Sequence, residues 1–336
     1  SLPFAGRYRL IDFPLSSMQN AGIHDVDVIM QRDYQSLLDH IGSGKTWDMS
    51  RKRGGLRLLP PFGEQDSGRG SRSTMDVLES IRNYIRDARQ DYFVLTTGTL
   101  AANIDLVAAV DRHLSSGASV TIVCSDSMED DSAHRFFADA DDFITNSQKN
   151  SGQRCLRSLD TCIVSKNTLL HAMDICRDNG GSRSHIFALQ SLIDEGCLIA
   201  AYIHSGHAVY ISSVERYYGA SMELLRDQLF PPDRPVSTKV RSDVSTYYGE
   251  GAKVSNSLIA DGCYIEGEIE NCLLFRGVHV GRGSVLKNCI MMQDAFIGDN
   301  VTLSYVISDK DTRVSDESTL AGSPKLQLIL PKMSSI

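Results

Sequence analysis

Two hydrophobic periodicities divide this chain. Up to about residue 229, short apolar runs alternate with amphipathic segments of helical period. From Tyr247 onward, apolar residues instead recur every six positions. Since the spacing of apolar residues reflects the repeat of the backbone, the two parts predict two different architectures.

The first part centres on a strand at Tyr92–Leu95, which follows a helical segment at Asp76–Ala88. We interpret it as a buried parallel strand, with Gly98 and Thr99 just past its carboxyl end, where open α/β sheets bind ligands. Further strands are predicted at 25–30, 119–124 and 198–202, and helices at 14–21, 34–41, 105–115 and 217–228. This alternation predicts an α/β domain with a mostly parallel sheet.

The second part contains four aligned segments that begin at Asn256, Asn271, Asn288 and Tyr305. The later starts lie 17 residues apart, and the first segment is two residues shorter. Six residues per side and three sides per coil describe a left-handed parallel β-helix. Within each segment the six-residue spacing relates Ile259 to Ile265, Leu274 to Val280 and Leu286, and Met291 to Ile297 and Leu303. An ordinary β-sandwich would not keep so regular a period.

Turn-forming residues and cysteines recur at fixed places within these segments. Gly or Asp stands at the tight corners, at Gly262, Gly277, Asp294 and Asp311. We expect Cys263, Cys272 and Cys289 to fill the coil interior. The predicted domains are therefore an α/β domain over 1–229, a proline-rich linker over 230–246 and the β-helix over 247–336.

Composition excludes several classes of function. The formal net charge of −8 argues against non-specific nucleic-acid binding, and no apolar run approaches the ~20 residues that span a bilayer. The eight cysteines form no C-x-x-C pair, which is typical of reduced thiols in the cytoplasm. Polar stretches at 127–142, 146–159 and 178–184 read as fragments joined across missing loop residues.

Long motifs near the amino end resemble a known family. FAGRYRLIDFPLSSMQNAGI, from Phe4, is similar to F-G-G-K-Y-R-I-I-D-F-x-L-S-N-x-x-N-S-G-I of the bacterial glucose-1-phosphate adenylyltransferases. QRDYQSLLDHIGSG, from Gln31, resembles their Q-Y-x-S-x-S-L-x-x-H-I. LPFAGRYRL and RKRGGLRLLPPF look most like the D-type regulatory subunit of glycogen biosynthesis. The resemblance covers nearly all of the chain and implies a nucleotidyltransferase-like (Rossmann-type) domain followed by a left-handed β-helix.

The reaction of that family joins ATP and glucose 1-phosphate into ADP-glucose and pyrophosphate. It requires a backbone cradle for phosphates, cationic side chains and carboxylates that hold Mg²⁺. By resemblance the phosphate loop lies upstream of residue 1, and the two metal carboxylates fall at Thr99 and Tyr210. Neither a threonine hydroxyl nor a phenol replaces a carboxylate at a hard cation. We therefore expect no metal or cofactor in this chain, and Mg²⁺ in a catalytic partner.

One other carboxylate could approach the metal position. Asp105 follows the central strand closely enough to reach in, which would leave a weak or redirected nucleotidyltransferase activity. Asp105 reads better as the N-cap of the helix that follows.

The remaining substrate-binding motifs are also altered. The family's G-T-A-D-A loop is replaced by Ser73–Val77, in which Thr74 and Asp76 survive. The alternative for these residues is a helix N-cap with a carboxylate in the first turn. Segments Ile144–Lys149 and Ile186–Gln190 lack the family's charged sugar-binding residues. The resemblance thus implies a vestigial pocket at Ser73, Thr74, Asp76, Gly98, Thr99 and Tyr210.

Arginines near the amino end suggest a regulatory site. Arg9 matches a family position that contacts anionic effectors, and Arg7 and Arg72 could complete a phosphate-binding fork. The alternative is a set of structural ion pairs.

Three hypotheses remain open at this point. The first is a regulatory, non-catalytic subunit of glucose-1-phosphate adenylyltransferase, associated with a catalytic subunit in a hetero- or homo-oligomer, expected to be a tetramer. The second is a weakly active sugar-phosphate nucleotidyltransferase. The third is an acyltransferase of the hexapeptide type with His279 as base, although His279 reads as a solvent-facing residue between buried Val278 and Val280.

Overall fold

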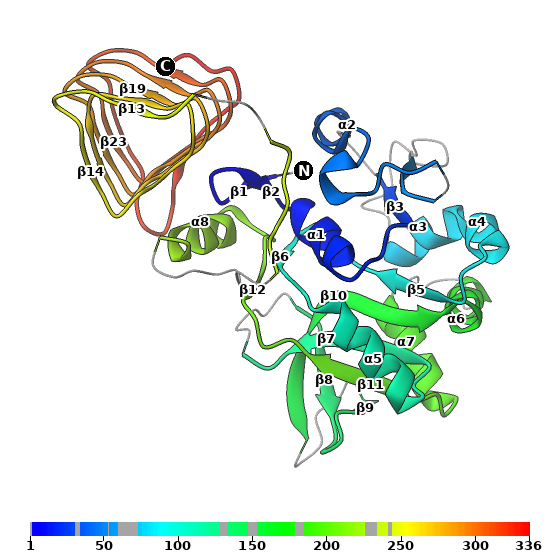
Figure 1. Cartoon of the computed structure of the whole chain (residues 1–336). Coiled ribbons are helices and arrows are strands. Elements are labelled where there is room, and N and C mark those ends of the chain that lie inside the picture. The colour runs from blue at the N-terminus through cyan, green and yellow to red at the C-terminus, as the bar shows by residue number, and fades with distance from the viewer. Residues whose placement is uncertain are drawn as a thin grey trace. The chain divides into compact units, whose positions relative to one another are not determined.

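The structure, a computed structural model, describes residues 2–30, 34–52, 54–59, 73–127, 133–146, 153–178, 185–225, 234–240 and 244–336 (Figure 1). It separates into two compact units. The sheet unit comprises Phe13–Tyr210 and Pro232–Val236, and the coil unit comprises Ser1–Asp12, Ile211–Pro231 and Ser237–Ile336.

A mixed sheet forms the centre of the sheet unit. Its strand order is β11-β7-β10-β8-β9. Strand β5 also pairs with β10, so that β10 lies between β5 and β7. The strands are β5 (Tyr92–Leu95), β7 (Val120–Ser125), β8 (Arg135–Ala138), β9 (Ile144–Asn146), β10 (Arg154–Ser165) and β11 (Ile199–Ile203). Strands β7 and β11 are parallel, whereas β10 runs antiparallel to β5, β7 and β8.

Two smaller strand pairs and a set of helices complete this unit. Strands β3 (Val26–Ile29) and β4 (Leu56–Leu59) are parallel, and β6 (Leu100–Ala102) and β12 (Ala208–Tyr210) are antiparallel. The helices are α1 (Asp12–Asn20), α2 (Gln35–Ile41), the 3-10 helix η1 (Lys45–Trp47), α3 (Thr74–Ser80), α4 (Arg82–Asp87), α5 (Leu106–Ser116), α6 (Lys166–Asp178) and α7 (His185–Asp194).

The α/β class is confirmed, but two details of the sequence-based interpretation are wrong. The helix expected over Asp76–Ala88 is two helices, α3 and α4, which meet at Ile81. The pairing recorded for β5 is antiparallel, because the long strand β10 returns between β5 and β7. The apolar alternation of β10 was not recognised, so the sheet was expected to be mostly parallel.

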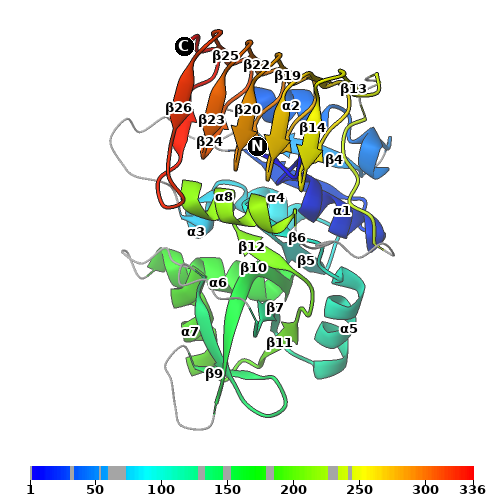
Figure 2. The ribbon, with the colours of Figure 1, turned by 90° about the vertical axis from the view of Figure 1, so that its left-hand side faces the viewer.

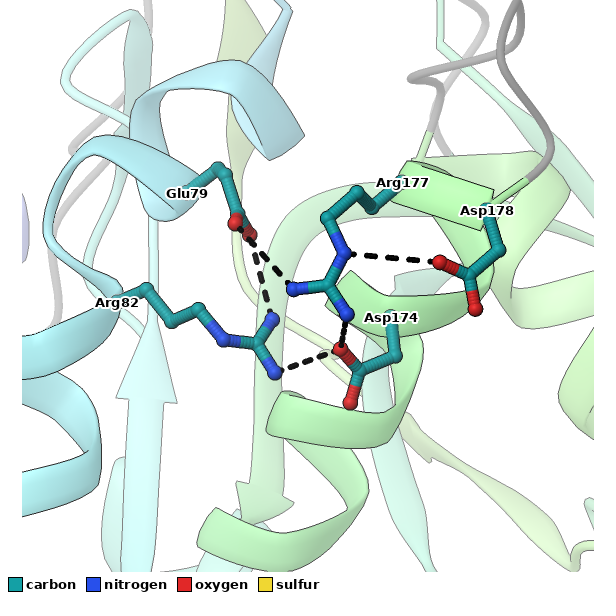
Figure 3. Close-up of polar contacts among 5 residues, drawn as sticks. All are labelled: Glu79, Arg82, Asp174, Arg177 and Asp178. Atoms are coloured by element: carbon teal, nitrogen blue, oxygen red, sulfur yellow. Dashed lines mark hydrogen bonds and ion pairs between the residues drawn. The ribbon is translucent and has the colours of Figure 1, made fainter.

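An ion-pair network joins the helices on one side of the sheet unit (Figure 3). Arg82 of α4 contacts Glu79 of α3 at 3.3 Å and Asp174 of α6 at 2.7 Å. Arg177 contacts the same Asp174 oxygen at 2.6 Å. Because one carboxylate bridges two guanidinium groups, the network fixes α6 against the α3–α4 pair.

The coil unit is a parallel β-helix of three five-stranded sheets, whose strands stack side by side in successive coils (Figure 2). The first sheet holds β13 (Tyr247–Tyr248), β16 (Tyr264–Ile265), β19 (His279–Val280), β22 (Phe296–Ile297) and β25 (Arg313–Val314). The second holds β14 (Lys253–Ser255), β17 (Glu268–Glu270), β20 (Val285–Lys287), β23 (Thr302–Ser304) and β26 (Thr319–Ala321). The third holds β15 (Leu258–Ile259), β18 (Leu273–Leu274), β21 (Ile290–Met291), β24 (Val306–Ser308) and β27 (Leu328–Leu330).

The predicted repeat is confirmed in its interior and at its corners. The apolar positions from Ile265 to Leu303 are buried, as are Cys263, Cys272 and Cys289. The predicted corner residues have left-handed backbones, with φ of 76° at Gly262, 71° at Gly277, 60° at Asp294 and 57° at Asp311. Gly and Asp adopt this region at the lowest cost, so the sequence pattern and the chain geometry agree.

The hairpin at residues 3–9 and helix α8 belong to the coil unit, and the hairpin lies against the third sheet of the coils. Outward-facing Leu273, Ile290 and Ile307 on this sheet are buried although they lie outside the coil interior. Strands β1 (Pro3–Phe4) and β2 (Tyr8–Arg9) form the hairpin, and its Gly6 lies so close to Leu258 that a Cβ would approach Leu258 Cδ2 to 2.5 Å.

Helix α8 (Val214–Glu223) approaches the coils at a corner. Tyr218 Oη donates to the carbonyl of Asn288 at 3.0 Å, and the Tyr218 ring lies 6.5 Å from that of Tyr305. The contacts therefore group residues 1–12 and 211–225 with the coils, whereas hydrophobic periodicity alone assigned them to the α/β domain.

Candidate functional site

Threonine hydroxyls occupy the carboxyl end of β5. Thr96 Oγ1 lies 2.8 Å from Thr161 Oγ1 of β10, and Thr97 Oγ1 lies 2.9 Å from Thr99 Oγ1. Gly98 and Thr99 are exposed. The tip of the central strand is therefore lined with neutral hydroxyl groups that bond to one another.

The β6–β12 ribbon places the two expected metal positions beside each other. Tyr210 pairs with Leu100, the residue that follows Thr99. Tyr210 is buried, with 7% of its surface exposed. The structure thus brings together Thr99 and Tyr210, which are more than a hundred residues apart in the sequence.

These residues do not fit a magnesium ion. Mg²⁺ in proteins is bound through carboxylates, and both positions carry an uncharged hydroxyl group. Among the described residues, no group of three or more His, Cys, Asp or Glu side chains is arranged to hold a metal ion. No catalytic step is therefore derived through a metal in this chain.

Asp105, the other candidate carboxylate, is engaged elsewhere. Its Oδ1 accepts from the backbone N–H of Ala108 at 3.0 Å, so the predicted N-cap of α5 is confirmed. Its Oδ2 lies 2.6 Å from Arg234 Nη1. Both oxygens of this carboxylate have partners.

A small cavity lies beside the threonines. It has a volume of about 10 Å³ and is lined by Pro14, Ser17, Thr96, Thr97, Leu100, Ala102, Ile104, Leu106 and Thr161. That volume holds roughly one water molecule. The described side chains leave no room there for a nucleotide.

The nucleotide-loop candidates form a capping box at the start of α3. Ser73 Oγ accepts from the N–H of Asp76 at 3.2 Å, and Asp76 Oδ2 accepts from the N–H of Ser73 at 3.1 Å. Thr74 is the first residue of the helix. These contacts match the N-cap alternative, with Ser73 as the cap.

The two sugar-site segments lie on two different elements that contact each other, a helix and a strand. Ile186–Gln190 lies within α7. Ile144–Asn146 forms β9, and residues 147–149 are outside the described part of the chain. Of the stretches suspected to have lost loop residues, 127–142, 146–159 and 178–184, the parts at 128–132, 147–152 and 179–184 are also outside it.

Cationic side chains gather in the coil unit around Arg9. Lys310 lies at a coil corner, and burial together with the neighbouring Arg9 and Lys332 lowers its pKa. The N–H of Arg9 donates to Asp12 Oδ2 at 2.9 Å, which fixes the turn that carries it. Exposed Arg7 lies over the Tyr8 ring at 5.0 Å, and Arg72 is outside the described residues.

Sequence analysis identified Arg9 but missed Lys310 and Lys332. Nothing in the local pattern at either lysine differs from an ordinary solvated corner. They join Arg9 only because the hairpin folds onto the coils. Their position as basic residues at corners of the repeat was the signal that could have identified these two lysines.

His279 belongs to an aromatic ladder on the first sheet of the coils. We define this ladder as Tyr247, Tyr264, His279 and Phe296, with Arg313 at its end. The His279 ring stacks at 4.9 Å on Tyr264 and at 4.5 Å on Phe296, with interplanar angles of 8° and 3°. Val278 and Val280 are buried, so His279 points outward as expected, and both faces of its ring are covered.

A membrane-spanning segment is not found: in the described part of the chain, no helix has the length and apolar character to cross a bilayer.

Comparison with known families agrees with the two units. The nucleotidyl transferase family model matches residues 1–136, and the model described as GlmU-like, C-terminal hexapeptide matches residues 241–325. The nucleotidyltransferase-like fold and the hexapeptide β-helix expected from the sequence are therefore confirmed.

Comparison with individual proteins identifies the family more narrowly. The glycogen biosynthesis protein GlgD of Bacillus subtilis is 37% identical over 85% of this chain and 76% of its own length. GlgD of Geobacillus stearothermophilus is 38% identical over the same shares. The glucose-1-phosphate adenylyltransferase of Clostridium beijerinckii is 28% identical over 85% of this chain and 77% of its own. The chain therefore belongs to the family of the glycogen biosynthesis protein GlgD, within the wider group that includes the glucose-1-phosphate adenylyltransferases.

Proposed function

We propose that this protein is a regulatory, non-catalytic subunit of glucose-1-phosphate adenylyltransferase in glycogen biosynthesis. It binds a catalytic paralogue in the cytoplasm, in a hetero-oligomer of tetrameric size, and changes that paralogue's activity. In this assembly Mg²⁺ is held by the catalytic subunit, and this chain holds no cofactor.

The observation that carries the proposal is the position of Tyr210, which pairs with Leu100, the residue after Thr99, close to the carboxyl end of β5. The fold still brings these two positions together, yet neither holds a carboxylate. Asp76, within the predicted pocket, and Asp105, which follows Thr99 in the sequence, both take part in capping a helix. The weakly active alternative needs a carboxylate at the metal, and the contacts of Asp105 argue against it.

The cations of the coil unit support a regulatory role. The positive charges of Arg9 and Lys332 act unfavourably on that of Lys310, and the carboxylates of Asp309 and Asp311 offset part of this effect. Such a cluster suits a phosphate-bearing effector, because charge-assisted bonds to guanidinium and ammonium groups would relieve the repulsion. Arg7 and Arg72 remain part of this proposed effector site.

The test is an assay of ADP-glucose synthesis from ATP and glucose 1-phosphate with Mg²⁺. The chain alone is expected to give no product above background. Added to its catalytic paralogue, it is expected to change the rate or the effector response and to co-elute with that paralogue. Turnover by the chain alone at a rate near that of the paralogue would sink the proposal.

Restoration of the carboxylates refines the test. Thr99 is exposed, so Thr99→Asp is expected to fold normally and to remain inactive, because one carboxylate is insufficient. Thr99→Asp combined with Tyr210→Asp shows whether these two losses alone account for inactivity. Circular dichroism of both variants separates a failure to fold from a failure to catalyse.

A further inference from the structure

A short strap, Arg234–Val236, is attached to the sheet unit through α1 and through the segment between β6 and α5. Asn20 Nδ2 donates to the carbonyl of Pro235 at 3.3 Å, and Asn103 Nδ2 donates to the carbonyl of Arg234. Val236 is buried. Arg234 Nη1 completes the attachment through its 2.6 Å ion pair with Asp105.

The strap holds the turn that leaves the β6–β12 ribbon. Asn103 and Asp105 flank Ile104, between the end of β6 and the start of α5. On its other side this turn is held by α1, since the N–H of Ile104 donates to Ser17 Oγ at 3.0 Å. Ile104 and Ser17 also line the small cavity beside the threonines. Asn103, Ile104 and Asp105 therefore connect the strap and α1 to β6, the strand that follows Thr99.

The attached strap leaves polar atoms unsatisfied. Asn103 Oδ1 and Arg234 Nε are buried and have no hydrogen-bond partner among the described residues. Burial of an unpaired polar atom opposes the attached state, whereas the charged bond to Asp105 favours it. The Arg234–Asp105 ion pair is therefore the charged contact that opposes this cost.

We propose that the strap is a releasable latch, with Arg234–Asp105 as its contact, and that it sets the mobility of the β6–β12 ribbon. The chain continues from Val236 into the coil unit at Ser237. An event in the coil unit that pulls on Ser237 therefore acts on the latch, and through Asn103–Asp105 on the ribbon that carries Tyr210. The inference concerns the ribbon and stands without the proposed regulatory function.

Amide hydrogen exchange of the full chain tests the latch. Arg234→Gln removes the positive charge of the ion pair. Asp105→Asn removes its negative charge while keeping a good N-cap for α5. Each variant is expected to speed exchange of the Ile104 amide and of the β6 amides at least about ten-fold, because the opening that exposes them becomes easier. The double variant is expected to match the single variants, because both remove one interaction.

Arg82→Gln is the matched control, since it breaks an ion pair of similar length and exposure between α4 and α6 in the same unit. It is expected to leave exchange at Ile104 and β6 unchanged. Faster exchange in Arg234–Val236 with no change at Ile104 and β6 overturns the latch, as does an effect that multiplies in the double variant. A general increase across β7 and β10 in either single variant also overturns it, because it would show a global loss of stability.

Discussion

At the scale of single residues, the corners of the coils show which residue types adopt a left-handed backbone. The third corner of successive coils is taken by Asn256, Asn271, Asn288 and Tyr305, with φ between 41° and 54°. Asn tolerates this region because its short amide bonds locally, whereas larger side chains pay about 1–2 kcal/mol. The segment starts recognised in the sequence are therefore corners, and the unexpected residue among them is Tyr305.

A second corner series gives a stability prediction. Gly283, Asn300 and Glu317 occupy it, with φ of 69°, 54° and 61°. Glu317 is exposed, so Glu317→Asn is expected to raise the free energy of unfolding by about 0.5–1 kcal/mol, because it relieves backbone strain. Urea denaturation measures the change. Asn300→Ala is the opposing control and is expected to lower stability by a similar amount.

Buried histidines predict how stability depends on pH. His113 is buried, its Nδ1 lies 2.9 Å from Thr121 Oγ1, and burial lowers its pKa below the ordinary value of 6.5. The unfolded chain therefore binds a proton at a higher pH than the folded chain does. The stability contribution is fully present above pH 6.5 and is lost as pH falls from there toward the folded pKa.

The corresponding experiment compares wild type with His113→Gln, which retains a polar group for Thr121. Between about pH 7 and pH 5, unfolding free energy of the wild type is expected to fall, by at most about 1.4 kcal/mol per pH unit for each such histidine. The variant is expected to show a shallower slope. Burial also lowers the pKa of His185 and His204, so the slope is not expected to vanish. Equal slopes in both proteins would contradict the assignment.

At the scale of elements, the aromatic ladder shows what one strand of each coil contributes. Tyr247 is 50% exposed, and Tyr264 and Phe296 are each 38% exposed, so the rings stabilise the coils mainly through one another. The in-register pairing of β13, β16, β19 and β22 aligns their outward side chains at one rung per coil. Arg313 continues the series over Phe296 at 5.4 Å.

His279 links the two halves of this ladder, which gives the next prediction. Each stacked pair contributes about 0.5–1.5 kcal/mol, so His279→Ala is expected to cost about 1–2 kcal/mol of unfolding free energy. His279→Phe is expected to cost far less, because it keeps both contacts. Chemical denaturation followed by circular dichroism provides the measurement. An equal loss in both variants would mean that stacking is unimportant there, and Thr302→Ala on an exposed neighbouring strand controls for strand propensity.

Much of the element order was predictable, and the exceptions have physical causes. The six-residue period correctly predicted the coil interior from Ile265 to Leu303, and Asp105 correctly marked the start of α5. Strand β10 was missed because Ser158–Thr161 contains a register shift and Asp160 has a φ of 42°. That bulge interrupts the alternation on which strand prediction depends.

At the scale of the whole molecule, contacts between residues that are distant in the sequence could not be predicted from sequence motifs. The motif identified Arg9, and the alignment identified Thr99 and Tyr210, one residue at a time. That Lys310 lies near Arg9, and that Arg234 holds Asp105, depends on how the chain folds back on itself. Sequence comparison could therefore name candidate residues, whereas the side chains that contact them depend on the fold.

The cation cluster yields a prediction about ligand binding, with inorganic phosphate as the probe. Arg9→Gln and Lys310→Gln are each expected to weaken binding about ten-fold, since a charged hydrogen bond contributes about 1.5–3 kcal/mol. Isothermal titration calorimetry measures it. Lys253→Gln, which removes a cation paired with Glu268 on β14, is expected to have no effect. Equal weakening by all three variants would indicate general electrostatics and not a site.

The grouping of residues 1–12 with the coils has a consequence for synthesis on the ribosome. Residues Phe13–Tyr210 contain nearly all of the sheet unit and can collapse while translation continues. The hairpin's partners on the third sheet begin at Leu258, so at roughly 5–20 residues per second it waits on the order of tens of seconds for them. During that interval Phe4, which is buried in the folded protein and lies 6.4 Å from the Tyr217 ring, lacks its native contacts, so the nascent hairpin is expected to bind chaperones.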